Sequence, residues 1–412
     1  MKLTLTCHLD FDKETAQILE EIRLHSSKFY NMTLYEIREG RFLEQNEFYN
    51  MFKDHFRSGY LQMHTYINSI KQAMKDMKSY YALLKKYKTY PSKNQNPGKP
   101  RFKHENNLME ATFLKTAIRL RNGHLLLSIG KKMKSDKQIK AINVRLPDEV
   151  YGLLSDKTIK MIKISYDKTL MKYMTRIVYE VKEMQLKDFG DIMAIDLGVK
   201  NLAAITFMDS TDQYLVDGNV LKSKIATFNK QLKESYSKEM KCTGSERFKL
   251  THKMKRQMRN RKGYIDNYIH TASKKIIDIA INHHVKTLVI GDFKSIKSEN
   301  KAKYFVQIPH SRLIKQLEYK SKLHGIEIVM QNESYTSIVS ALDLEKVSKE
   351  YADNSKRIKR GLFKSATQFI NADINGSLNI IRKYDNYKNI PRLIEQVRDK
   401  GFRENPIRLL VI

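Results

Sequence analysis

The first half of the chain changes its hydrophobic periodicity twice. Apolar and polar residues alternate over residues 2–9, which is typical of a strand. From residue 12 onwards the apolar positions recur at helical spacing, so we expect helices over 12–25, 46–56, 61–77 and 80–87. Between residues 112 and 183 the period returns to two. This part predicts short strands over 116–120, 124–129, 141–146, 161–166 and 174–181.

These changes of period predict a discontinuous N-terminal module. We expect residues 1–10 and 99–188 to form one β-rich, barrel-like module, with residues 11–98 as a helical insertion after its first strand. Pro91, Pro97 and Pro100, together with Gly98, mark the loop in which the chain leaves the helices.

From residue 192 onwards the pattern is that of an α/β domain. Strands are predicted over 192–197, 202–207 and 213–216, followed by a long basic helical region over 221–284. The remaining predicted elements are a strand at 287–290, a helix at 311–324, a strand at 326–330 and a helix at 371–384. The order β-β-β-α-β-α-β-α is that of the ribonuclease H type of fold, which we expect over residues 189–384. Residues 385–412 form a polar, basic tail without a recognisable motif.

The charge of the chain points to a polyanionic partner. Its 412 residues include 76 Lys and Arg against 45 Asp and Glu, which gives a formal net charge of +31 and a pI near 9.8. Nucleic acid is the partner that this surplus favours, ahead of an anionic membrane surface. A membrane span would need about 18 consecutive apolar residues, and no such stretch occurs. A hydrophobic fraction of 41% is too high for a disordered chain.

The two cysteines, Cys7 and Cys242, lie far apart in the sequence. They exclude a zinc finger or zinc ribbon, which needs four ligands in close pairs, and they exclude a disulfide framework. The N-terminus turns polar too early for a secretory signal peptide. We therefore expect a reduced, cytoplasmic protein.

Three basic stretches are candidate nucleic-acid contacts. They cover residues 71–103, where tyrosines are available for base stacking, residues 246–262, and residues 356–364. Each has a plainer interpretation as a solvated helix face, linker or loop. Contacts of this kind follow the phosphate backbone and carry no sequence information. The candidate residues are Lys85, Lys86, Tyr87, Lys99, Arg101, Lys103, Lys253, Lys255, Arg256, Arg259, Arg261, Arg357 and Arg360.

Two acidic residues stand in unusual surroundings. Asp196 lies inside an apolar strand, where an unpaired carboxylate is costly and needs a cation or hydrogen bonds. Gly198 follows it and lets a second molecule approach the backbone. Asp373 opens the final predicted helix beside small residues. Each has a structural alternative, since Asp196 could bond to a turn and Asp373 could stabilise its helix by capping and by the helix dipole.

Together, the two acidic segments resemble a nuclease family. Residues 195–202, Ile-Asp-Leu-Gly-Val-Lys-Asn-Leu, and residues 373–380, Asp-Ile-Asn-Gly-Ser-Leu-Asn-Ile, resemble the first and last motifs of the RuvC-type nuclease domain of TnpB proteins. These are transposon-encoded RNA-guided DNA endonucleases related to type V CRISPR effectors. The resemblance covers essentially the whole chain and is densest after Asp191. It implies an RNase H-like (RuvC) α/β nuclease domain, a β-barrel-like wedge module and a helical recognition insertion.

The resemblance also implies a reaction and its partners. Family nucleases hold two Mg²⁺ ions with three or four carboxylates and hydrolyse a phosphodiester. A guide RNA, either a transposon-encoded non-coding RNA or a CRISPR-like RNA, would supply specificity by pairing with double-stranded target DNA. The first hypothesis is therefore an RNA-guided, Mg²⁺-dependent DNA endonuclease. A nuclease-inactive, repressor-like RNA-guided DNA binder is the alternative, and a DNA-strand transferase is a third hypothesis.

The family's middle carboxylate is missing from its usual place at the end of the fourth strand, where this chain has Gly291. Asp292 could substitute, a carboxylate from elsewhere could enter, or the site could be inactive. Strand alternation turns Asp292 to the face opposite position 291. In this fold the first strand borders the fourth, and the fourth borders the fifth. Glu333, just past the end of the fifth strand, therefore starts roughly 10 Å from Asp196 at the same edge of the sheet. We favour Asp196, Glu333 and Asp373 as catalytic metal ligands, an arrangement that resembles a rearranged site in part of the family.

A second departure from the family concerns zinc. Family members often carry four cysteines between the fifth strand and the last motif, whereas residues 335–370 contain none. We expect this segment to be a zinc-free loop that holds nucleic acid near the site.

Overall fold

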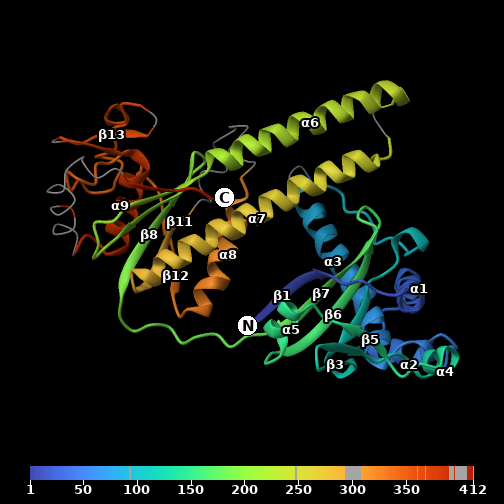
Figure 1. The fold of residues 1–412 in the computed structure, drawn as a ribbon. Coiled ribbons are helices and arrows are strands. Elements are labelled where there is room, and N and C mark those ends of the chain that lie inside the picture. The colour runs from blue at the N-terminus through green and yellow to red at the C-terminus, as the bar shows by residue number, and fades with distance from the viewer. Residues whose placement is uncertain are drawn as a thin grey trace. The chain divides into compact units, whose positions relative to one another are not determined.

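Separate hydrophobic cores divide the chain into two units, Met1–Lys182 and Glu183–Ile412 (Figure 1). The computed structural model describes residues 1–91, 94–245, 248–292, 308–359, 361–366, 368–388, 394 and 406–411. The boundary lies within the segment that the sequence analysis assigned to the end of the β-rich module.

The strands of the first unit lie in two sheets. The larger sheet has the order β1 (Lys2–His8), β7 (Lys172–Glu180), β6 (Thr158–Asp167) and β2 (Ala111–Leu114), and the smaller one consists of β3 (Ile118–Arg121), β4 (His124–Leu127) and β5 (Ile142–Arg145). As the sequence analysis expected, the N-terminal strand joins this module, through antiparallel pairing of β1 with β7. In the described part of the unit, no strand pairing closes the sheets into the barrel that was expected.

The helices of the first unit are fewer and longer than the periodicity predicted. The main ones are α1 (Lys13–Arg38), α2 (Gln45–Phe52) and α3 (Met63–Thr89). The helices predicted over 61–77 and 80–87 are one helix, because no glycine or proline interrupts it. Two short helices were missed, α4 (Lys131–Lys137) and α5 (Asp148–Leu154). Short 3-10 helices lie at η1 (Ser58–Tyr60), η3 (Glu105–Asn107) and η4 (Lys115–Ala117).

The second unit is built on a six-stranded sheet of order β12-β11-β8-β9-β10-β15. β8 (Asp191–Leu197), β9 (Asn201–Phe207) and β10 (Tyr214–Asp217) are antiparallel, and β11 (Val285–Asp292) pairs in parallel with both β8 and β12 (Glu327–Asn332). Counted within this unit, the first strand (β8) borders the fourth (β11), and the fourth borders the fifth (β12), as predicted for a ribonuclease H type of fold. β15 (Ile407–Leu409) adds a parallel edge strand beside β10. The sequence analysis did not predict a strand in this C-terminal tail.

Helices cover both faces of this sheet. α7 (His252–Asn282) and α8 (His310–Leu323) pack on one face, where they share a core with Met193, Ile195 and Leu197 of β8. α9 (Ala372–Tyr384) packs on the other, against the smaller side chains Ala194 and Ala204. α6 (Asn219–Thr243) and α7 replace the single helical region predicted over 221–284, and both are drawn in Figure 1. Before α9 come η7 (Asn354–Lys356) and the hairpin β13 (Leu362–Lys364) and β14 (Phe369–Asn371).

Candidate active site

Asp196 lies near the C-terminal end of β8, on the face of the sheet that α9 covers. Met193, Ile195 and Leu197 point to the face of α7 and α8, while Ala194 packs against α9. Because side chains alternate along a strand, Asp196 points to the same face as Ala194. The strand thus delivers this carboxylate to the side of the sheet on which Asp373 lies.

Asp373 occupies the first turn of α9 but does not cap the helix. Asn371 is the cap, since its side chain accepts hydrogen bonds from the backbone N–H groups of Asp373 and Ile374 at 3.0 and 3.3 Å. The Asp373 carboxylate instead accepts a hydrogen bond of 2.6 Å from Nδ2 of Asn201. The Arg357 guanidinium lies 3.9 Å from its other oxygen. The capping alternative considered from the sequence is therefore not what Asp373 does.

Close packing of α9 on β8 brings Asp196 against the helix backbone. A Cβ added at Gly376 would lie 3.3 Å from Cγ of Asp196 and would meet its Oδ2 at shorter range. The Ser377 hydroxyl donates a hydrogen bond of 3.1 Å to the carbonyl of Ala194, which lies two residues before Asp196 on β8. A glycine at 376 is needed because any side chain there would occupy the space of the carboxylate.

Glu333 reaches the space that Gly291 leaves open. It follows β12 directly, and a Cβ added at Gly291 would lie 2.6 Å from its Cγ and 2.7 Å from its Cδ. The pairing of Ile290 with Ile195 places position 291 beside Asp196 on the neighbouring strand. The Glu333 side chain therefore fills the volume that a residue at 291 would otherwise use, next to Asp196.

Asp292 lies on the face of β11 opposite to Gly291, although its charge still acts on the Glu333 carboxylate. β11 stays paired with β12 in regular register through Asp292, opposite Asn332. On β11, Leu288 and Ile290 pack towards α7 and α8 while Val289 packs towards α9, so Gly291 faces α9 and Asp292 does not. Position 291, and not Asp292, therefore shares its face of the sheet with Asp196.

The charges of Glu333 and Asp373 both act on the buried Asp196 carboxylate. Burial, followed by the charges of Glu333 and Asp373, raises the pKa of Asp196 well above its ordinary value, and Arg357 opposes this rise. Burial and the charge of Asp292 raise the pKa of Glu333 to about 7. A divalent cation is the kind of partner that relieves such repulsion.

Two buried oxygen atoms of this group of residues accept no hydrogen bond. They are Oε1 of Glu333 and Oδ1 of Asn201, whose Nδ2 donates to Asp373. Unsatisfied buried acceptors are rare and call for an ion or a water molecule. Carboxylate and amide oxygens are hard ligands suited to Mg²⁺. Within the described ranges, no three acidic, histidine or cysteine side chains already converge closely enough to enclose an ion. The residues present thus fit a magnesium site chemically, with Asp373 still held by Asn201 and Arg357.

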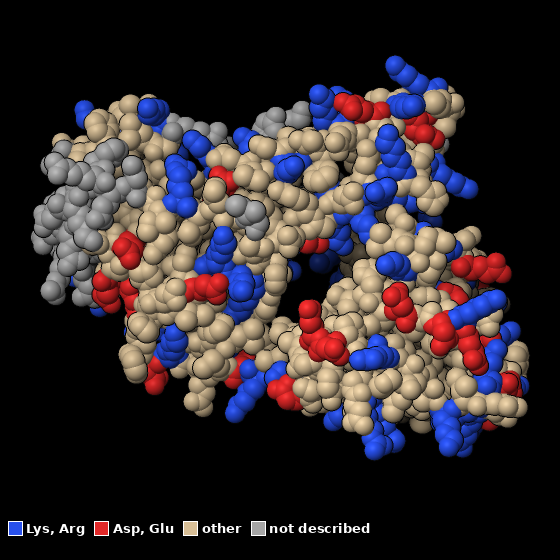
Figure 2. Space-filling view, viewed as in Figure 1, with Lys and Arg blue, Asp and Glu red and all other residues tan. Residues whose placement is uncertain are grey.

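The predicted basic residues fall into different surroundings. On the first unit, Lys85, Lys86, Lys99 and Arg101 are exposed and Tyr87 is half-buried, but Nζ of Lys103 lies 5.0 Å above the Tyr30 ring. On α7, Lys253, Lys255 and Arg256 are exposed, Arg259 is half-buried, and Nε of Arg261 donates to Asn229 on α6 at 3.0 Å. Figure 2 shows Lys and Arg side chains spread over α6 and α7, at the upper right of the view. Arg360 lies outside the described residues.

Sequence reasoning missed two residues of the site. Asn201 was part of the first motif but was given no role, although a polar residue that opens a buried strand was a usable signal. Arg357 was assigned to nucleic-acid binding alone, whereas its guanidinium lies beside Asp373. Nothing in the local sequence of residues 356–364 distinguishes Arg357 from the other bases.

Two segments of the second unit match known protein families. Residues 176–297 match the OrfB_IS605 family, described as "Probable transposase", and residues 310–380 match the family described as "Cas12f1-like, TNB domain". A TnpB-like protein of Methanocaldococcus jannaschii is 29% identical over 167 residues, which cover 38% of this chain and 58% of that protein. The CRISPR-associated endodeoxyribonuclease Cas12f2 of a Micrarchaeota archaeon is 25% identical over 228 residues, which cover 52% of this chain and 40% of that protein. The matches span less than two thirds of these relatives.

Solved structures share the fold. The Cas12f1 chain of a complex with single-guide RNA and target DNA has a TM-score of 0.57 at 16% identity, over 90% of this chain and 83% of that one. The mini-RNA-guided endonuclease CRISPR-Cas phi3 has a TM-score of 0.50 at 10% identity, over 93% and 92% of the two chains. In the part of the chain that the structure describes, no helix combines the length and apolar character needed to cross a membrane.

The family matches fall on the segments that carry the acids. The first contains Asp196, and the second contains Glu333 and Asp373. The chain is thus similar in sequence to a TnpB-like protein and to Cas12f nucleases, and its second unit has the strand order expected for a ribonuclease H type of fold.

Proposed function

We propose that this chain is a transposon-associated, RNA-guided DNA endonuclease that cleaves target DNA by two-metal-ion hydrolysis, with Asp196, Glu333 and Asp373 as the metal ligands. The observation that supports it most is the buried Oε1 of Glu333, which has no hydrogen-bond donor and lies in the space beside Asp196 that Gly291 leaves open. A site without a ligand would have no reason to hold a third carboxylate there, since it costs desolvation and repulsion.

Each residue of the site has a defined task in this proposal. Two Mg²⁺ ions bound there would activate a water molecule and stabilise the leaving oxygen of the scissile phosphodiester. Asp196 and Glu333 hold ligand oxygens at the end of the sheet, and Asp373 supplies another from α9. Asn201 orients the Asp373 carboxylate through its 2.6 Å hydrogen bond. Arg357 lies where a DNA phosphate would approach Asp373.

The proposed partners are a guide RNA, transposon-encoded or CRISPR-like, and double-stranded target DNA. The net charge of +31 and the exposed bases of α7 support backbone contacts to both. We propose that residues 1–10 and 99–188 act as the wedge module, residues 11–98 as the recognition insertion and residues 335–370 as a zinc-free nucleic-acid-binding loop. The relatives named above include enzymes described as endodeoxyribonucleases, and a solved complex that contains guide RNA and target DNA.

A cleavage assay tests the proposal. The protein is purified with the RNA that copurifies with it, that RNA is sequenced, and a plasmid carrying the matching target is incubated with Mg²⁺. We expect a double-strand break that depends on the guide and on Mg²⁺ and disappears with a chelator. Guide-dependent binding without any break would favour the repressor-like binder, and joined DNA ends would favour a strand transferase; either result contradicts the endonuclease proposal.

Replacing Arg357 by alanine should slow cleavage by about tenfold, equivalent to about 1.4 kcal/mol, with target binding changed by less than about twofold. The reason is that Arg357 acts at Asp373 and at the approaching phosphate rather than along the duplex. Single-turnover cleavage and gel-shift titration with the same guide measure the two effects. Arg357→Lys should recover part of the rate, because the positive charge remains.

Arg145 provides the matched control for this change. It is exposed on the first unit, with the Asp148 carboxylate 4.0 Å away, so Arg145→Ala removes the same charge from the unit that does not carry the three acids. It should leave the cleavage rate unchanged. If Arg357→Ala weakened binding and cleavage to the same degree, Arg357 would be a binding residue only.

A further inference from the structure

α9 presents a buried polar face to the segment that follows Glu333. Asn375, Asn379 and Arg382 are spaced by four and three residues, which places them on one side of the helix. All three are at most 2% exposed. Polar side chains buried this deeply cost free energy unless they are hydrogen-bonded, so their partners show what the face is built to hold.

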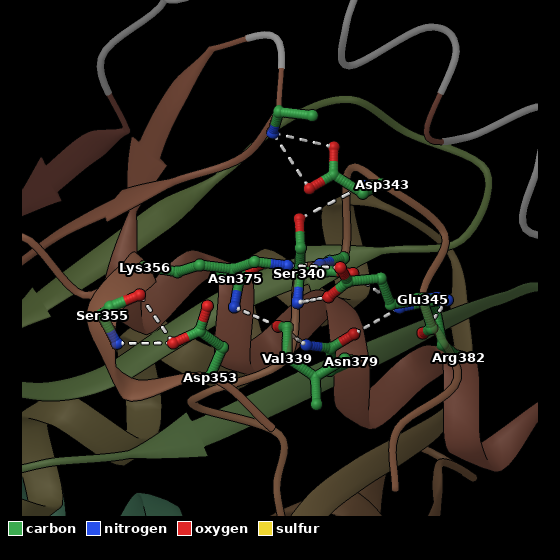
Figure 3. A network of polar contacts seen from close by, with 12 residues as sticks. Val339, Ser340, Asp343, Glu345, Asp353, Ser355, Lys356, Asn375, Asn379 and Arg382 are labelled. Carbon is green, nitrogen blue, oxygen red and sulfur yellow. Dashed lines mark hydrogen bonds and ion pairs between the residues drawn. The ribbon is translucent and has the colours of Figure 1, made fainter. Parts of the chain in front are cut away.

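The two asparagines hold backbone groups of the segment over residues 336–341. Nδ2 of Asn379 donates to the carbonyls of Thr336 and Val339 at 2.9 and 2.8 Å. Asn375 donates to the Val339 carbonyl at 2.9 Å and accepts from the Ala341 N–H at 2.9 Å (Figure 3). This segment contains turns and no strand, so it lacks a sheet partner to fix its backbone, and α9 supplies that restraint.

Arg382 sets the orientation of the Asn379 amide. Its guanidinium donates to Oδ1 of Asn379 at 2.7 Å, which leaves Nδ2 directed at the two carbonyls. The same guanidinium donates to the Glu345 carbonyl at 2.6 Å. The Glu345 carboxylate in turn accepts from the Ser340 N–H at 2.9 Å and pairs with Lys356 (Figure 3). Side-chain contacts from α9 therefore hold both ends of the turn over residues 336–345.

One residue connects this turn to Glu333. The backbone N–H and the hydroxyl of Thr336 donate to the Glu333 carbonyl at 3.1 and 2.8 Å. The Thr336 carbonyl is itself an acceptor of Asn379. Two hydrogen bonds thus separate the Asn379 amide from the backbone of the acid that fills the space above Gly291.

We propose that Asn379 is a positioning residue for the metal site: supported by Asn375 and Arg382, it fixes the turn that holds the Glu333 carboxylate beside Asp196. The inference rests on the proposed function. α9 then sets all three acids, because it carries Asp373, approaches Asp196 through Gly376 and holds the backbone after Glu333. Such a restraint is needed because repulsion from Asp196 would otherwise displace a carboxylate carried by a turn.

Asn379→Asp is the sharpest test, because it keeps the shape and the acceptor for Arg382 but replaces the donor with an acceptor that faces two carbonyls. The variant and the wild type, each with its guide RNA, are compared by hydrogen–deuterium exchange over residues 333–345, by target binding and by single-turnover cleavage across Mg²⁺ concentrations. We expect faster exchange in this segment and about a tenfold or greater loss of cleavage rate. The Mg²⁺ concentration for half-maximal cleavage should rise, and target binding should change by less than about twofold.

Two further variants complete the design. Thr336→Val removes the hydroxyl bond to Glu333 at nearly constant volume and should give the same changes to a smaller degree, which decides the question if Asn379→Asp fails to fold. Asn282→Asp makes the same charge change at an exposed position at the end of α7 and should behave as wild type.

The outcomes separate this inference from the proposed function. A wild-type protein that never cuts contradicts the proposed function, and the inference with it. Wild-type cleavage together with normal Mg²⁺ dependence in both variants, despite faster exchange, overturns the inference alone. Equal losses of binding and cleavage in both variants would show a general structural role and overturn it as well.

Discussion

Replacing Glu333 by glutamine should abolish measurable DNA cleavage while guide-dependent target binding stays intact. Glutamine keeps the size of the side chain but removes the negative charge that a divalent ion needs from its ligand. Because bound metal contributes several kcal/mol to phosphodiester hydrolysis, the rate should fall by at least about 100-fold. Single-turnover cleavage of a labelled target and filter binding with the same complex measure the two properties.

Glu327→Gln is the matched control, since Glu327 lies exposed on the same strand, β12, and the change is chemically identical. It should cut at the wild-type rate. In the absence of Mg²⁺, the Glu333→Gln protein should melt at the same temperature as wild type or slightly higher, because a buried, unpaired carboxylate is removed. Full cleavage by Glu333→Gln would exclude Glu333 from the site and reopen the case for Asp292.

Strand periodicity was the most reliable guide to the arrangement of the acids. Asp196 was proposed because a carboxylate in an apolar strand is costly. Glu333 was proposed because strand adjacency in a ribonuclease H type of fold brings the ends of the fourth and fifth strands together, and because such a placement resembles a rearranged site in part of the family. The parallel pairing of β11 with β8 and β12 confirms that adjacency. Predictions based on the period of a strand and on neighbouring strands are local or depend only on topology, so they need no knowledge of side-chain packing.

The parts that sequence reasoning missed depend on contacts between distant segments. Asn201 and Asp373 are 172 positions apart in the sequence, and Asn379 and Thr336 are 43 positions apart. No local sequence pattern therefore predicts either hydrogen bond. The three-residue strand β15 is defined by its pairing with β10 rather than by its own sequence. The longer helices of the first unit were underestimated because tertiary packing continues a helix where the apolar stripe is irregular.

Gly291 and Glu333 share one volume, so moving the carboxylate between them should be possible. Gly291→Glu alone should lose cleavage, because even its Cβ would lie 2.6 Å from Cγ of Glu333 and two acids would compete for the space beside Asp196. Combined with Glu333→Ala, the new glutamate gains room next to Asp196 on the adjacent strand, about 4.8 Å away. The double variant should recover at least about tenfold in rate over Glu333→Ala, equivalent to about 1.4 kcal/mol of transition-state stabilisation.

The control for this exchange is Gly291→Gln with Glu333→Ala, which fills the same space without a charge and should recover nothing. Cleavage rates are measured at saturating Mg²⁺, and target binding confirms that each protein still assembles with its guide. Recovery by the glutamate and not by the glutamine would show that the site needs a carboxylate in that volume and is indifferent to the strand that supplies it. Wild-type activity in Gly291→Glu alone would instead mean that the two positions do not compete, and the geometric basis for assigning Glu333 to the metal site would be lost.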